Sequence, residues 1–155
     1  MAELHIQGLA ELHKALQQLP EELEKKILRG ALGAGARVMK KAAQERVPVK
    51  SGALRKSVRV KTSARKGRYR LKATIVAGNK EAFYAHMVEF GTARHMIRAG
   101  AKKALLFGGV MREQVEHPGA DPHPFMRPAL DASSEAAVQA FAEHVRQRLE
   151  KEGAL

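Results

Sequence analysis

Apolar residues recur at helical spacing in three stretches of the chain. Leucines at every third or fourth position from Leu9 to Leu19 predict a short amphipathic helix that ends before Pro20. The same spacing continues over about 20–46, where acidic residues in the first turn and basic residues later suit the helix dipole. A third stripe predicts a helix over about 127–151. The expected buried face of this last helix consists of Leu130, Val138, Phe141, Val145 and Leu149.

Two hairpins are predicted between the helices. Segments 57–62 and 69–77 alternate apolar with basic residues, which predicts a β-hairpin with one apolar and one basic face. Gly108-Gly109 separates the apolar segments 104–107 and 110–116, as is typical of a two-residue hairpin turn.

Helices at the ends and hairpins between them predict an α+β fold. We expect one domain over 1–155, with a long N-terminal helix and a C-terminal helix packed on a small antiparallel sheet built from hairpins. A short edge strand is expected over 4–8 and a short helix over 82–90. Flexible loops are expected at about 62–69 and 92–124.

The long helix over 20–46 contains three glycines, each of which costs up to about 1 kcal/mol relative to alanine. Two interpretations remain open for Gly30, Gly33 and Gly35. They allow another backbone to pack closely against the helix, or they mark a bend near Gly33.

Composition excludes several classes of protein. The 155 residues include no cysteine, so disulfides and thiolate metal sites are excluded. No apolar run approaches the roughly 20 residues of a membrane span, and the first residues lack the pattern of a secretory signal. We therefore expect no contact with a membrane.

Positive charge is concentrated in one segment. Arg37 to Lys72 contain 14 Lys and Arg and one acid, a net +13, whereas the whole chain has a net charge of +12. We expect the basic face of the first hairpin to contact phosphates or an acidic protein ring; the alternative is a solvated face that protects a strand edge. The scarcity of aromatic residues disfavours stacking of single-stranded bases. The residues of this expected contact face are Arg59, Lys61, Arg65, Lys66, Arg68, Arg70 and Lys72.

The candidates for catalysis and metal binding are weak. His117 and His123 flank a proline-rich loop with Asp121, but no two histidines stand four residues apart on a predicted helix. Glu89 lies in an apolar stretch, where a carboxylate needs a partner, and we expect an ion pair or a contact between subunits. Signatures of phosphate-binding loops and hydrolases are missing. We therefore predict no catalytic residue, no metal ligand and no cofactor.

Three segments carry a family resemblance: 47–57 (VPVKSGALRKS), 84–92 (YAHMVEFGT) and 123–130 (HPFMRPAL). In this order they resemble the tail-component family of long-tailed double-stranded DNA bacteriophages, small proteins of the head-to-tail joining region. The positions that match the family pattern, and for which the resemblance implies a structural role, are Pro48, Gly52, Leu54, Ser57, Tyr84, Ala85, Glu89, Phe90, Gly91, Thr92, Pro124, Phe125, Arg127, Pro128 and Ala129. From the residues alone, Phe125 and Met126 are expected to anchor the chain to the core as it enters the last helix.

The resemblance implies a structural component of the phage neck or tail-completion region. Such a protein would form a ring with itself, would meet the connector or head-closure proteins and the tail-terminator or tail-tube proteins, and would surround genomic double-stranded DNA. Six copies would match the tail symmetry and are favoured, whereas twelve would match the portal. The protein would be made in the bacterial cytoplasm and would reside at the neck of the virion. The alternative is a basic, non-enzymatic protein that binds double-stranded DNA.

One further expectation concerns the segment 92–109. Long segments without regular structure are usually functional or disordered. We expect this segment and the turn at Arg65–Arg68 to become ordered on contact with an axial neighbour.

Overall fold

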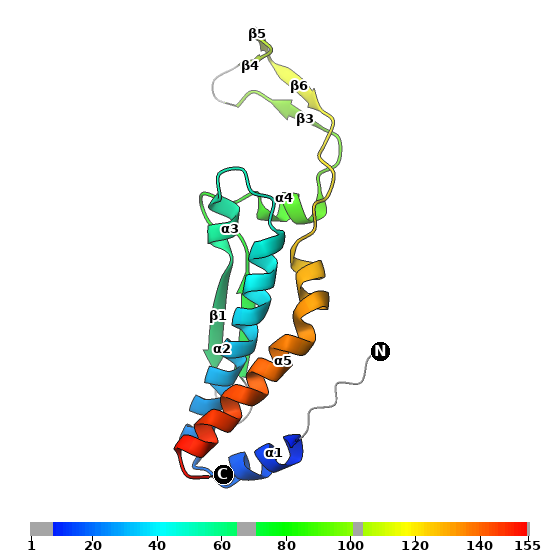
Figure 1. Ribbon diagram of the computed structural model, residues 1–155. Helices are drawn as coiled ribbons and strands as arrows, with labels where there is room; N and C mark the ends of the chain where they lie inside the picture. Colours follow the sequence, from blue (N-terminus) through cyan, green and yellow to red (C-terminus); the bar gives the residue numbers. More distant parts are fainter. Residues whose placement is uncertain (1–7, 65–70, 101–103, 155) are drawn as a thin grey trace.

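The computed structural model describes residues 8–64, 71–100 and 104–154. Figure 1 shows an elongated body of helices and one β-ribbon, with an arm of short strands that projects beyond one end. The expected strand over 4–8 lies outside the described residues except for Gly8, and so does most of the first hairpin's turn.

Two long helices form the axis of the body. α2 (Glu21–Arg46) and α5 (Met126–Lys151) each have 26 residues and run antiparallel side by side (Figure 1). α1 (Leu9–Gln17) lies across the end where α2 begins and α5 finishes. All three helices confirm the prediction from apolar spacing to within a few residues.

The glycines of α2 bring α5 close. A Cβ atom at Gly35 would lie 2.7 Å from the Ala137 carbonyl oxygen, and one at Gly30 would lie 2.5 Å from the His144 Nε2 atom. Since α2 continues unbroken from Glu21 to Arg46, close packing is the role of these two glycines.

The first hairpin packs on α2. β1 (Arg59–Ala64) and β2 (Leu71–Val76) pair antiparallel, with Val60 opposite Ile75. The sequence predicts a first strand over 57–62, but Ser57 ends a short helix, α3 (Ala53–Ser57), because its hydroxyl donates a hydrogen bond to the Leu54 carbonyl at 2.7 Å.

The arm begins after α4 (Ala85–Phe90) and returns to the start of α5. Its described residues form two small antiparallel sheets, one of β3 (His95–Arg98) with β6 (Gln114–His117), the other of β4 (Leu105–Phe107) with β5 (Val110–Arg112). The predicted turn at Gly108-Gly109 is confirmed, with φ angles of 60° and 79°. Segment 95–98, expected as loop, is a strand because it pairs with 114–117.

The predicted α+β class is confirmed, and the described hairpins form three separate two-stranded sheets. Ile27, Val145 and Leu149 centre one core between α1, α2 and α5. Phe125, Val58 and Leu54 centre a second core near the base of the arm.

The predicted buried face of α5 is wrong at Leu130, whose side chain is 50% exposed. Ala129, Ser133 and Ala137 are the buried residues of this part of α5, and α2 approaches the Ala137 backbone closely at Gly35. The larger side chain of Leu130 is therefore on the outside. Phe125 is 1% exposed, which confirms its expected role as an anchor.

Candidate functional site

The family-pattern residues gather at the junction between the body and the arm. α3, α4 and the first turn of α5 meet there, around the second core. Most members of the pattern are buried or hydrogen-bonded at this junction, so they shape the backbone from which the arm departs.

Glu89 holds α4 to the start of α5. Its carboxylate accepts the backbone N–H groups of Phe125 at 2.8 Å, Met126 at 2.9 Å and Arg127 at 3.2 Å. The first N–H groups of a helix have no partner within the helix, and a negative charge also suits the positive end of the helix dipole. The sequence predicts an ion pair or a contact between subunits for Glu89; in the described chain, its partners are backbone amides of α5.

These hydrogen bonds change the acidity of Glu89. Burial by itself raises the pKa of a carboxyl group. The N–H groups of Met126, Phe125 and Arg127 outweigh this effect, and the pKa of Glu89 lies below its ordinary value of 4.5. The carboxylate is therefore held in the charged form, which suits a helix cap rather than a proton donor.

Ser57 and Arg59 fasten α3 to the end of the ribbon. The Ser57 hydroxyl accepts the Gly78 N–H at 2.9 Å, and the Ser57 side chain is almost fully buried. The Arg59 guanidinium donates to the carbonyls of Ser57 at 3.1 Å and of Gly78 at 2.6 Å. The sequence predicts Arg59 as a contact for phosphates or a partner, and here its guanidinium bridges two backbone segments.

The chain segments that enter and leave the arm are paired at its base. Thr92 and Ala120 exchange backbone hydrogen bonds of 2.9 and 3.0 Å. Gly91 and Gly119 flank this bridge, with φ angles of 70° and 95°. A Cβ at Gly91 would lie 2.6 Å from the Ala120 carbonyl oxygen, and one at Gly119 would collide with that of Thr92. Only glycine fits here, which explains the glycine of the 84–92 segment.

The remaining pattern residues have plain positions. Gly52 precedes α3 with a φ of 78°, and Tyr84 packs edge-on against Phe83 with ring centroids 5.8 Å apart. Buried members are Leu54, Ser57, Ala85, Phe125 and Ala129. Exposed members are Pro48, Phe90, Pro124 and Arg127, while Pro128 lies within the first turn of α5 and is partly buried.

The predicted basic face is only partly described. Lys61 and Lys72 are exposed on the ribbon, on the opposite face from Val60 and Ile75. Arg65, Lys66, Arg68 and Arg70 lie outside the described residues.

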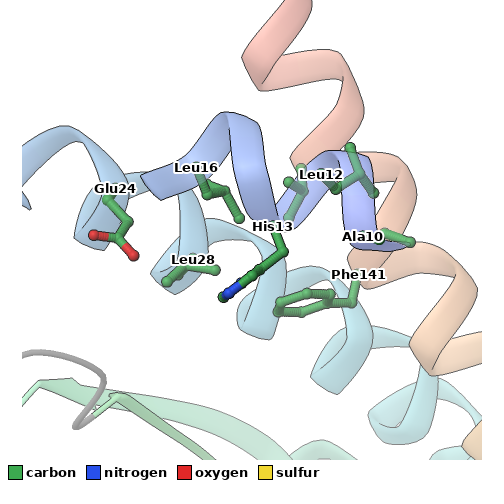
Figure 2. A pocket seen from close by; sticks show the side chains of 9 residues that line it. Ala10, Leu12, His13, Leu16, Glu24, Leu28 and Phe141 are labelled. Carbon is green, nitrogen blue, oxygen red and sulfur yellow. The ribbon is translucent and has the colours of Figure 1, made fainter. Parts of the chain in front are cut away.

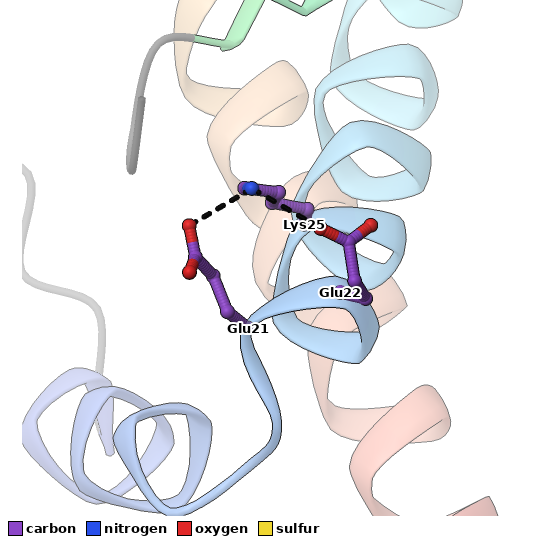
Figure 3. Close-up of polar contacts among 3 residues, drawn as sticks. All are labelled: Glu21, Glu22 and Lys25. Atoms are coloured by element: carbon purple, nitrogen blue, oxygen red, sulfur yellow. Dashed lines mark hydrogen bonds and ion pairs between the residues drawn. The ribbon is translucent and has the colours of Figure 1, made fainter. Parts of the chain in front are cut away.

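Sequence reasoning missed a basic groove beside the ribbon. Its lining includes Lys26, Arg29 and Arg37 of α2, and the Arg29 guanidinium donates to the Thr62 hydroxyl at 3.4 Å. The spacing of these three cations along one helical face was the available signal. The positive charge of Lys25 is offset by Glu21 and Glu22, whose carboxylates accept hydrogen bonds from its ammonium at 2.8 and 3.3 Å (Figure 3). Those two carboxylates raise the pKa of Lys25.

The histidines considered as metal ligands do not form a metal site among the described residues. His95 and His117 stack with ring centroids 5.1 Å apart, because β3 and β6 place them opposite each other. Within residues 8–64, 71–100 and 104–154, no group of three His, Asp or Glu side chains is arranged to hold a metal ion. The same part of the chain has no helix with the length and apolar character of a membrane span.

An apolar pocket of about 630 Å³ lies between α1, α2 and α5. Figure 2 shows the side chains of Leu16, Leu28 and Phe141 around it, with the Glu24 carboxylate at one end. Among the described residues, the polar side chains of its lining are those of His13 and Glu24, fewer groups than a site that orients a polar substrate normally presents.

Fold and site together define a small α+β protein whose family-pattern residues build the base of a projecting arm. The family described as "Bacteriophage HK97-gp10, putative tail-component" matches residues 10–91, more than half of the chain, and the protein belongs to this family. The match covers the body from α1 to α4 and ends at Gly91, where the arm begins. No curated protein and no solved structure matches the chain.

Proposed function

We propose that this protein is a structural component of the phage particle that completes the neck and joins the DNA-filled head to the tail as a ring of identical copies. Membership of a phage tail-component family supports the virion role. The observation that carries the joining role is the arm, because the family-pattern residues Glu89 and Gly91 fix the geometry with which it leaves the body.

The role proposed is assembly rather than chemistry. The hydrogen bonds of Glu89, Ser57 and Arg59 run to backbone groups: those of Glu89 hold α4 to the start of α5 at the base of the arm, and those of Ser57 and Arg59 hold α3 to the end of the ribbon. A family of tail components also favours a structural over a catalytic role. A ring of copies would use a heterologous interface that closes by rotation, and six copies would match the tail.

The neighbours in this proposal are proteins and DNA. One side of the ring would meet the connector or head-closure proteins, and the other the tail-terminator or tail-tube proteins. Genomic double-stranded DNA would pass through the opening. The finished protein would reside in the virion, after synthesis in the bacterial cytoplasm.

Electron microscopy of a lysate made with the gene disrupted tests the proposal. Filled heads lying apart from finished tails are the expected result, and a plasmid copy of the gene should restore joined particles. Intact particles would overturn the assembly role. Abnormally long or absent tails would overturn the joining role and replace it with tail termination.

The basic groove favours a second candidate, a protein that binds double-stranded DNA. Lys26, Arg29 and Arg37 lie along one groove, and exposed Lys61 lies on the adjoining ribbon. A phosphate-driven binder should hold duplex DNA tightly at low salt and lose affinity steeply as salt rises. Alanine at Lys26, Arg29 and Arg37 should then reduce the salt slope, whereas alanine at an exposed lysine elsewhere, Lys151, should not. Weak binding by the isolated chain would count against this candidate.

A further inference from the structure

An apolar groove runs along the body beside β2. Its upper part, next to the base of the arm, has a volume of about 800 Å³, and its lower part about 360 Å³. Met39, Ala73 and Ile75 line both parts, so the two are continuous. α2 forms the floor, and β2 and α5 form the walls.

The groove approaches β2 from its edge. Successive residues of a strand point to opposite faces, yet the upper groove is lined by four consecutive β2 residues, 72–75. Among the described residues, β2 pairs with β1 alone, and no β1 residue lines either part of the groove. The backbone groups of β2 that point away from β1 therefore face the groove, where they are available to a further strand.

The arm presents the complementary features. Leu106 and Met111 are cross-strand partners with exposed fractions of 73% and 65%, and Ile97, opposite Val115, is 39% exposed. Each described sheet of the arm has only two strands, and such a pair is marginally stable in water without further packing. The arm thus has both an apolar surface to bury and strand edges to pair.

The arm does not reach the groove of its own chain. Figure 1 shows it extending beyond α4, away from α2, β2 and the length of α5. A second copy is the occupant that offers both matching surfaces at once, since every copy has an arm and a groove.

The charges of the groove and of the arm indicate which strand of the arm lies beside β2. Exposed Lys72 and Arg127 line the upper groove. β6 directly follows exposed Glu113, and it carries Glu116, whose carboxylate forms an ion pair with Arg94 of the same arm; β3 carries exposed Arg98. Opposite charges favour β6, and not β3, as the strand beside β2.

We propose that the arm of one copy docks in the β2–α5 groove of a second copy, with β6 added to the free edge of β2. This inference rests on the proposed ring and specifies its lateral contact. It replaces the axial neighbour expected for segment 92–109 with an adjacent copy. The interaction is a strand addition, in which backbone hydrogen bonds give affinity and the apolar walls give specificity.

The absence of cysteine from the sequence makes a direct test possible. Thr74→Cys in β2 and Gln114→Cys in β6 are combined in one chain, which is purified and treated with a short bismaleimide that tolerates a small error in register. The expected result is a ladder of covalently linked copies. Each single variant, and Thr74→Cys combined with Lys151→Cys at the far end of α5, should give no ladder.

A second variant tests the apolar contact without relying on a cross-link. Leu106→Ser with Met111→Ser should weaken self-association roughly tenfold or more. The fold should survive because both side chains are exposed, and circular dichroism checks this. Val49→Ser, at a side chain that is 64% exposed but lies outside the arm and groove, is the matched control.

Two results would overturn the docking. One is an oligomer in which the thiols introduced at positions 74 and 114 do not cross-link and which the Leu106 and Met111 changes leave unaffected. The other is a chain that stays monomeric at high concentration. Separated heads and tails in the gene-disrupted lysate, together with either result, would leave the neck role standing while rejecting this contact.

Discussion

Glu89 and Met126 are 37 residues apart in the sequence, yet the Glu89 Oε2 atom accepts the Met126 backbone N–H at 2.9 Å. This contact joins α4, from which the arm departs, to α5, to which it returns. With the Phe125 and Arg127 N–H groups it satisfies donors that a helix leaves unpaired at its first turn. One side chain thus closes the loop of chain that contains the whole arm.

Glu89→Ala should lower the free energy of unfolding by about 1–2 kcal/mol, the usual cost of removing a helix cap. Urea denaturation measures the change. Glu135→Ala is the control, because Glu135 is exposed in the middle of α5. Equal stabilities for the two variants would show that the cap contributes nothing.

The same cap should make stability depend on pH. The pKa of Glu89 is lower in the folded chain than its ordinary value of 4.5, so the unfolded chain binds the proton more tightly. The contribution is therefore fully present above about pH 4.5 and is lost as pH falls through the lowered pKa of the folded state. The difference in unfolding free energy between wild type and Glu89→Gln should shrink over that acidic range. A difference that stays constant from neutral pH down to about pH 3 would contradict this cause.

The packing of α2 on α5 gives a prediction of opposite signs at two glycines of one helix. Gly35→Ala should destabilise by about 1–3 kcal/mol, since the new Cβ would lie 2.7 Å from the Ala137 carbonyl oxygen. Gly33→Ala should stabilise by up to about 1 kcal/mol, because its nearest neighbour is the flexible Arg37 guanidinium at 3.3 Å. Thermal or urea unfolding compares the two variants. Destabilisation of the same size at both would mean that helix contact is not what Gly35 provides.

The helices could be predicted from sequence because each carries its own periodic signal. The exact face of α5 could not, since the inner position went to small residues that let α2 approach, and Leu130 was left outside. β3 has only four residues, and its partner at 114–117 is distant in the sequence, so no local pattern predicted this strand.

The candidate site also has features that the sequence predicts and features that it does not. A carboxylate at Glu89 in an apolar stretch signalled the need for a partner, but the partner is backbone on another helix, and backbone carries no sequence signal. The groove beside β2 also depends on which strand edge remains open. That property belongs to the arrangement of the elements and is absent from any single segment.

The last prediction concerns the base of the arm. Gly119→Ala should disrupt the Thr92–Ala120 bridge, because the new Cβ would collide with the Thr92 carbonyl oxygen and the φ of 95° disfavours any side chain. The body should keep its helices, since the bridge lies outside both cores. Limited proteolysis should then cut within the arm faster than in wild type, while circular dichroism stays unchanged. Gly100→Ala is the control within the arm, because its Cβ would meet no atom of the described residues within 4 Å and its φ is not in the left-handed region. Equal cleavage rates for the two variants would mean that the bridge does not hold the arm.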